Sequence, residues 1–119
     1  MSTKQELDEL QKKVLAFRDA RDWKQFHNPK DLAISLLLEA AELLEHFQWK
    51  NPEEMLKHLK NNKEEIADEL ADVFYFVLIA ANDFEIDLGE AMSKKLAKNE
   101  AKYPVDKSKG SHKKYTELL

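Results

Sequence analysis

The sequence has no cysteine and only two glycines and three prolines among its 119 residues. Without cysteine the chain can form neither a disulfide framework nor a thiolate metal site, which fits the cytosol. So few glycines and prolines leave few chain breaks, and this predicts a small number of long elements. The length predicts one domain, small enough that self-association would help to stabilise its core.

Charge and hydropathy argue against several classes of protein. The formal net charge of −4 gives no general reason to expect a nucleic-acid partner. The first residues of the chain lack the apolar region of a secretory signal. The longest near-apolar run, about residues 73–81, is too short to span a bilayer. We therefore expect a cytoplasmic protein without a membrane or nucleic-acid partner.

Apolar residues recur at helical spacing along most of the chain, and no segment alternates as a strand does. Asn28-Pro29 and Asn51-Pro52 are typical helix starts, as is Asp87 with Glu90. The expected helices cover about residues 3–22, 29–49, 52–59, 63–84 and 87–103. We predict an all-α fold, a four- to five-helix bundle that is oligomeric, with a helical domain over 1–103. A basic tail over 104–119, flexible in isolation, could fold over an anionic ligand.

Two acidic pairs, Glu39 with Glu42 and Glu69 with Asp72, are the most informative feature of the chain. Each pair is spaced i, i+3, so both carboxylates project from one face of a helix, beside an apolar stretch. None of the four has a lysine or arginine four residues later to pair with. If the two helices pack as neighbours, the acidic faces converge into one pocket.

Such carboxylates repel one another. At about 4 Å and an effective dielectric of about 20, two like charges cost roughly 4 kcal/mol. A divalent cation would turn this repulsion into attraction, and all-oxygen ligands favour Mg²⁺, with Mn²⁺ as a substitute. The sequence therefore predicts a site for a hard cation.

Two other functions fit a helical bundle with acidic faces. A carboxylate-bridged di-iron protein needs Glu-x-x-His, yet none of the four histidines has a glutamate three residues before it. A non-catalytic helical module that binds a nucleotide or a protein stays open, because acidic faces are often only solvated.

Several further residues are candidates for substrate binding. Trp23 and Trp49 lie at helix ends, where they could be core lids or stack on a nucleobase. On the last long helix, one face carries Lys95, Asn99 and Tyr103. That face is either solvated or able to bind phosphate.

These segments resemble the MazG-like all-α NTP pyrophosphohydrolases, and within them the dCTP pyrophosphatase branch. The resemblance runs from about residue 15 to 118. Four motifs carry it in the order found in that branch: RDWKQFHNP at 21–29, ELLEHFQWK at 42–50, DELADV at 68–73, and YPV at 103–105 with SKGS at 108–111 and KYT at 114–116.

The resemblance implies roles for particular residues. The two acidic pairs would be Mg²⁺ ligands, and the base and sugar site would be lined by Trp23, His27 and Trp49. Lys95, Asn99 and Tyr103 would face the phosphates or the sugar. Phe76 stands where a tyrosine is expected in the relatives, so it can stack on a base but cannot donate a hydrogen bond to it.

The resemblance also implies a reaction: the Mg²⁺-dependent hydrolysis of a dNTP to dNMP and pyrophosphate, in nucleotide-pool sanitation. The substrate could be dCTP or a modified dCTP, and the protein a dimer or tetramer. Glu45, one turn beyond Glu42, is a candidate to position the attacking water. The helical domain over 1–103 would then be the catalytic domain.

Overall fold

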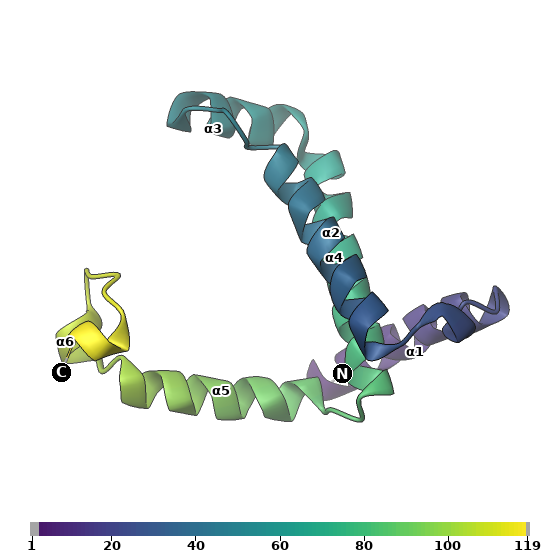
Figure 1. Cartoon of the computed structure of the whole chain (residues 1–119). Coiled ribbons are helices and arrows are strands. Elements are labelled where there is room, and N and C mark those ends of the chain that lie inside the picture. Colours follow the sequence, from purple (N-terminus) through teal and green to yellow (C-terminus); the bar gives the residue numbers. More distant parts are fainter. Residues whose placement is uncertain (1–2, 119) are drawn as a thin grey trace. The chain divides into compact units, whose positions relative to one another are not determined.

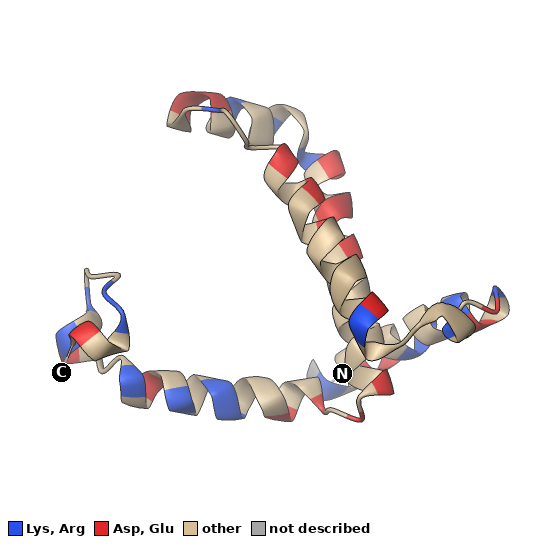
Figure 2. Cartoon of the chain, viewed as in Figure 1, with Lys and Arg blue, Asp and Glu red and all other residues tan. Residues whose placement is uncertain are grey.

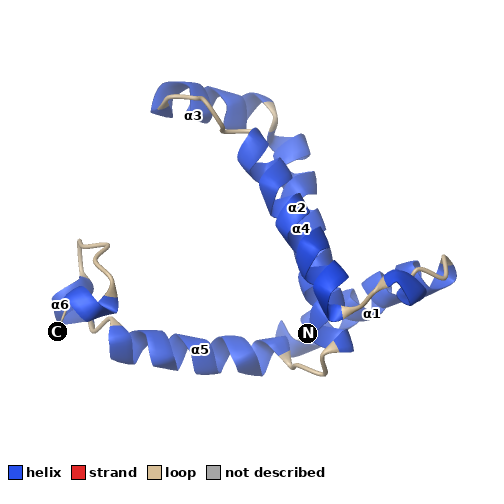
Figure 3. Cartoon of the chain, in the orientation of Figure 1, coloured by secondary structure: helices blue, strands red, loops and turns tan. Residues whose placement is uncertain are grey.

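The fold is all-α, as predicted from the sequence. A computed structural model describes residues 3–118, and these residues contain no strand (Figures 1 and 3). The helices are α1 (Thr3–Ala20), α2 (Pro29–Glu45), α3 (Pro52–Asn61), α4 (Lys63–Asp83), α5 (Leu88–Lys102) and α6 (Val105–Ser108). Two short 3₁₀ turns accompany them, η1 (Lys24–Phe26) and η2 (Tyr115–Glu117).

The predicted start signals begin three of the helices. The side chain of Asn28 accepts a hydrogen bond from the Asp31 backbone N–H at 2.9 Å, with proline in the first turn of α2. Asn51 and Glu54 form a capping box at the start of α3. The Asp87 side chain accepts from the backbone N–H of Glu90 at the start of α5.

The end of α2 differs from the expectation, because the helix stops at Glu45 and not near Trp49. The backbone N–H groups of Phe47 and Gln48 both donate hydrogen bonds to the carbonyl of Leu44, and this tightens the last turn. Trp49 then adopts a positive φ of 67° in the connection to α3. The apolar periodicity continues through this segment, so it could not reveal the turn.

The segment predicted as a flexible tail carries α6 and η2. Pro104 precedes α6 with a φ of −58° and a ψ of 142°. Three hydrogen bonds to the carbonyls of Pro104 and Val105 close this single turn. A helix this short leaves almost no periodic pattern in the sequence, so apolar spacing does not predict it.

The chain divides into two compact units, residues 1–85 and 86–119. The first contains α1 to α4, and the second contains α5, α6 and η2. Within the first unit α2 and α4 run antiparallel and side by side, while α1 and α3 also pack on α4 (Figure 1). The α2–α4 pair is therefore the scaffold on which the first unit is built.

The core of the first unit is small. Its buried apolar side chains are Leu32, Ile66, Leu78, Ile79 and Ala81. Many large apolar side chains stay exposed, among them Leu37, Leu44, Leu70 and Phe74. Across residues 3–118, no helix is both long and apolar enough to cross a membrane.

A buried ion pair joins α1 to the end of α4. The Arg18 side chain is 2% exposed, and its Nη1 donates to both carboxylate oxygens of Asp83 at 3.0 Å. Its Nε donates to the more exposed Asp19 at 3.0 Å. A buried guanidinium needs such partners because an unpaired charge is costly to remove from water.

Candidate metal centre and adjoining cavity

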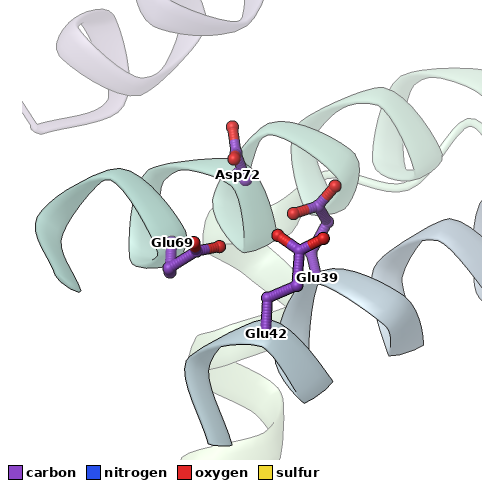
Figure 4. A group of neighbouring side chains, drawn as sticks. All are labelled: Glu39, Glu42, Glu69 and Asp72. Carbon is purple, nitrogen blue, oxygen red and sulfur yellow. The ribbon is translucent and has the colours of Figure 1, made fainter. Parts of the chain in front are cut away.

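The two acidic pairs come together between α2 and α4 (Figure 4). Glu39 and Glu42 project from α2, and Glu69 and Asp72 project from α4. One carboxylate oxygen from each of the four lies within 4.8 Å of those of the other three. Because each pair is spaced by about one helical turn, the antiparallel packing of two helices is enough to assemble the cluster.

The cluster belongs to a wider acidic region. Figure 2 shows acidic residues on both helices of the pair in the half nearer α3, whereas α5 in the second unit carries several lysines. None of the four carboxylates has an ion-pair partner among the described residues. The cluster is thus a concentration of negative charge that no ion pair within residues 3–118 neutralises.

Burial and mutual repulsion act on this cluster together. Desolvation is the main cause that raises the pKa of Glu39, followed by the negative charges of Glu42 and Asp72. Desolvation also raises the pKa of Glu69, followed by a hydrogen bond of its protonated form with Glu42 and by that carboxylate's charge. The imidazole of His46 opposes this rise. Both glutamates are held in a setting that disfavours their charged form.

Two carboxylate oxygens of the cluster are also unpartnered. Oε2 of Glu39 and Oε2 of Glu69 are shielded from solvent, and neither has a hydrogen-bond partner within the described part of the chain. Burying an unpaired carboxylate oxygen costs free energy that a bound cation would offset. The donor set, four carboxylates without sulfur or nitrogen, matches the preference of Mg²⁺ and Mn²⁺.

A cavity of about 480 Å³ adjoins the cluster. Glu39 and Asp72 line it together with side chains that are mainly aromatic or aliphatic: Lys13, Val14, Phe17, Trp23, Tyr75 and Phe76. The predicted base-site residues Trp23 and Phe76 therefore share one cavity with two of the four carboxylates. A cavity with an apolar wall beside a cluster of anionic ligands can take a flat ring together with a charged, metal-bound group.

His27 lies next to this cavity and lines a second one. Its ring is 6.5 Å from that of Phe76, and the second cavity, of about 570 Å³, is also lined by Asn82 and Asp83. Burial is the main cause that lowers the pKa of His27, with the positive charge of Arg18 adding to it. Nδ1 of His27 is buried, without a hydrogen-bond partner in residues 3–118.

The other predicted site residues are not among those that line the two cavities. Glu45 is exposed at the last position of α2, and Trp49 is 92% exposed in the α2–α3 connection. Lys95 and Asn99 lie on α5 and Tyr103 caps its C-terminus, so all three belong to the second unit. Their roles in the site stay predictions.

The structure adds residues that the sequence pattern did not single out. Val14 and Phe17 of α1 line the cavity, as does Tyr75, one turn after Asp72 on α4. Near the other end of α2, Nδ1 of His46 and Nε2 of His58 are 2.9 Å apart. The i, i+3 spacing of Tyr75 from Asp72 was a signal available in the sequence, but the apolar run around Tyr75 pointed to a core position instead.

Comparisons with known proteins agree on one family. The sequence model of the MazG-like family matches residues 34–118. The dCTP pyrophosphatase 1 of Bos taurus is 36% identical over 98% of this chain and 70% of its own length. The dCTP pyrophosphatase 1 of Mus musculus is 38% identical over 94% of this chain and 67% of its own length. A crystal structure of a pyrophosphatase from Archaeoglobus fulgidus matches with a TM-score of 0.79 and 42% identity, covering 83% of this chain and 93% of that one.

Proposed function

The chain belongs to the MazG-like family of NTP pyrophosphohydrolases, and on this premise we propose that it hydrolyses a deoxynucleoside triphosphate to the monophosphate and pyrophosphate. The proposed substrate is dCTP or a modified dCTP, because the relatives are named dCTP pyrophosphatase 1. The proposed setting is the cytoplasmic nucleotide pool, which the enzyme would clear of unwanted triphosphates. This role comes from the family resemblance.

One observation carries the proposal: four carboxylates converge beside a cavity with aromatic walls. Glu39, Glu42, Glu69 and Asp72 would hold Mg²⁺, or Mn²⁺ in its place. The two shielded, unpartnered oxygens of Glu39 and Glu69 support this assignment, since a cation would supply the missing partner. When bound, the metal ion supplies positive charge that offsets the charge developing on the triphosphate oxygens.

The cavity walls give the proposed base site. The ring of Trp23 is edge-on to Phe17 at 5.7 Å, and the adjacent rings of Tyr75 and Phe76 are 5.0 Å apart. Such a wall can stack on or enclose a flat base, and Glu39 and Asp72 line the same cavity for the phosphate end. His27 would contact the sugar or the base from the neighbouring cavity.

The resemblance implies roles for the remaining predicted residues. Trp49 would add a second flat surface for the base, and Lys95, Asn99 and Tyr103 would face the phosphates or the sugar. The 104–119 segment, with its lysines, would supply further positive charge around the leaving pyrophosphate. The resemblance supports the roles given to Trp49, Lys95, Asn99 and Tyr103.

The proposed reaction is a single hydrolysis. The oxygen of one water molecule forms a bond to a phosphorus of the triphosphate as one P–O bond of the α,β-anhydride breaks. The bridging oxygen leaves with the group whose phosphorus is not attacked, which is pyrophosphate for attack at the α-phosphorus and dNMP for attack at the β-phosphorus. One water proton passes to a base and the other is released to solvent as the new phosphate group ionises. Glu45 would position the water and accept a proton from it. Reactions of this class depend mainly on positioning and on charge stabilisation.

Self-association is part of the proposal. The first unit leaves large apolar side chains exposed on the α2–α4 pair, including Leu37, Leu44 and Leu70. Covering this surface would add the apolar burial that its small core lacks. We infer a homodimer or homotetramer, which sedimentation equilibrium or light scattering would measure. A monomer at micromolar concentration would contradict this inference.

Product analysis tests the proposed function directly. Each dNTP and NTP is incubated with the protein, with and without Mg²⁺, and the products are separated by anion-exchange chromatography. We expect monophosphate and pyrophosphate in equal amounts, dependent on Mg²⁺, with a cytosine nucleotide preferred. Hydrolysis in H₂¹⁸O followed by mass spectrometry then identifies the phosphorus attacked. Tight nucleotide binding without turnover would favour the non-catalytic binding module instead.

A further inference from the structure

We propose that Tyr75 selects the base, its hydroxyl forming a hydrogen bond with the polar edge of the nucleobase in the cavity beside the carboxylates. The inference rests on the nucleotide binding that the proposed function requires, because it assigns a ligand group to the same cavity. Phe76 has no group that can form a hydrogen bond with the base, and the inference assigns this role to its neighbour in sequence, Tyr75. The position and surroundings of Tyr75 support it independently of any relative.

The first argument is a hydroxyl without a partner. Oη of Tyr75 is shielded from solvent, and nothing in residues 3–118 forms a hydrogen bond with it. Tyrosine hydroxyls that are buried usually find a partner, because an unpaired one loses the hydrogen bonds it made with water. A folded protein that leaves such a group unpartnered in a residue lining a cavity is suited to a ligand that supplies the partner.

The second argument is the place of Tyr75 in the cavity. Its ring lines the same cavity as Glu39 and Asp72, and it follows Asp72 on α4 by one helical turn. Of the other lining side chains, Val14, Phe17 and Phe76 carry no hydrogen-bonding group, and Lys13 and Trp23 carry only donors. A base seated there needs a polar contact to be distinguished from other bases, and Tyr75 offers a neutral donor and acceptor.

The third argument is that neighbouring rings hold Tyr75 in place. Phe17 meets it edge-on at 6.2 Å, and Phe76 does so at 5.0 Å. The Phe17 ring is itself covered by the guanidinium of Arg21 at 3.7 Å, which also donates to the Phe17 carbonyl. A fixed hydroxyl loses little freedom when a ligand binds, so its hydrogen bond favours one arrangement of partner atoms over others.

The hydroxyl also keeps its proton at neutral pH. Burial raises the pKa of Tyr75, and the positive charges of Arg18 and Arg21 oppose this rise without reversing it. Tyr75 can therefore both donate to a ring nitrogen or carbonyl and accept from an exocyclic amine. Bases that differ at these positions differ in the bond they make with it.

The test compares the base preference of the wild type with that of Tyr75→Phe, which removes one oxygen. We expect kcat/KM for the preferred dNTP to fall about tenfold, mainly through KM, and by less than about twofold for the other bases. The matched control is Ser93→Ala, which removes a hydroxyl from an exposed position of α5 outside the cavity lining and should leave the base preference unchanged. An unaltered preference in Tyr75→Phe, or an equal loss in the control, would overturn the inference.

Two further measurements separate this inference from the proposed function. Calorimetric titration with α,β-imido dNTPs, which resist cleavage, should show the same weakening in Tyr75→Phe even if the wild type has no turnover. That result would remove the proposed function and leave the inference standing. If the wild type and Tyr75→Phe both turned over dNTPs with the same base preference, the proposed function would stand and the inference would be overturned. Without nucleotide, Tyr75→Phe should melt at the same or a higher temperature, whereas a drop of several degrees would show that the hydroxyl already has a partner.

Discussion

Glu39 on α2 and Glu69 on α4 each keep one carboxylate oxygen shielded from solvent and unpartnered within the described chain, and their ligand oxygens lie within 4.8 Å of each other. Two helices that pack through apolar side chains have thus brought two acids to a place where desolvation and neighbouring charge raise the pKa of each. The arrangement costs folding free energy in the metal-free protein and is suited to a cation.

The first prediction concerns Glu39→Gln. The change should lower kcat for Mg²⁺-dependent turnover about a hundredfold or more, because it removes one anionic ligand. It should also raise the melting temperature of the metal-free protein. Removing the Glu39 charge should relieve on the order of 1 kcal/mol of screened repulsion with the other carboxylates. In a small domain this corresponds to a rise in melting temperature of roughly 4 °C. Activity assays and calorimetry in EDTA check both effects.

The control for this prediction is Glu9→Gln, the same change at an exposed position of α1. It should leave turnover and the stabilisation by Mg²⁺ unchanged. If Mg²⁺ raised the melting temperature of Glu39→Gln by as much as it raises that of the wild type, the assignment of Glu39 as a ligand would be wrong.

The second prediction is a pH dependence of stability that follows from the raised pKa values of Glu39 and Glu69. A carboxyl whose pKa is higher in the folded than in the unfolded state binds more protons when folded. The charged carboxyl lowers the free energy of unfolding. This loss is absent below about pH 4.3, the pKa of the group in the unfolded chain, and is complete above its raised pKa in the folded protein. The metal-free wild type should lose stability across that window.

Melting curves of the wild type and Glu39→Gln in EDTA, recorded from pH 4 to 7, measure this effect. The advantage of the variant should grow as pH rises, because the wild type acquires the charge that the variant lacks. A constant difference at every pH would mean that Glu39 titrates normally.

The third prediction concerns the ion pair of Arg18 with Asp83, whose side chains are 2% and 17% exposed. Asp83→Asn should destabilise the protein by about 3 kcal/mol, because it leaves a buried guanidinium without its main counter-charge. Asp19→Asn is the matched control. Asp19 also contacts Arg18 at 3.0 Å but is 56% exposed, so its loss should cost less than about 1 kcal/mol. Urea unfolding measures both, and equal costs would contradict the assignment of the buried pair.

The fourth prediction tests the role that the family resemblance assigns to Trp49. Its side chain is 92% exposed, so Trp49→Ala should change the free energy of unfolding by no more than about 0.5 kcal/mol. The same change should raise KM for the nucleotide more than it weakens Mg²⁺ binding. An unchanged KM for every dNTP would remove Trp49 from the base site.

Several features could be predicted from local sequence, because helices depend on contacts between residues close in the chain. The starts of α2, α3 and α5 were correct since Asn28, Asn51 and Asp87 cap backbone groups three residues away. The all-α fold, the family and the enzyme class, an NTP pyrophosphohydrolase, are confirmed. The end of α2 was wrong by several residues because no glycine or proline marks it, and the one-turn α6 was missed.

The sequence by itself determined that two helices each carry a pair of carboxylates on one face, because the 3.6-residue repeat places residues three apart together. Only the tertiary structure decided that the two pairs meet within 4.8 Å and that Trp23, Tyr75 and Phe76 line one cavity with Glu39 and Asp72. These contacts join α1, α2 and α4 across long stretches of chain. Their geometry depends on how whole helices pack, and no local pattern encodes it.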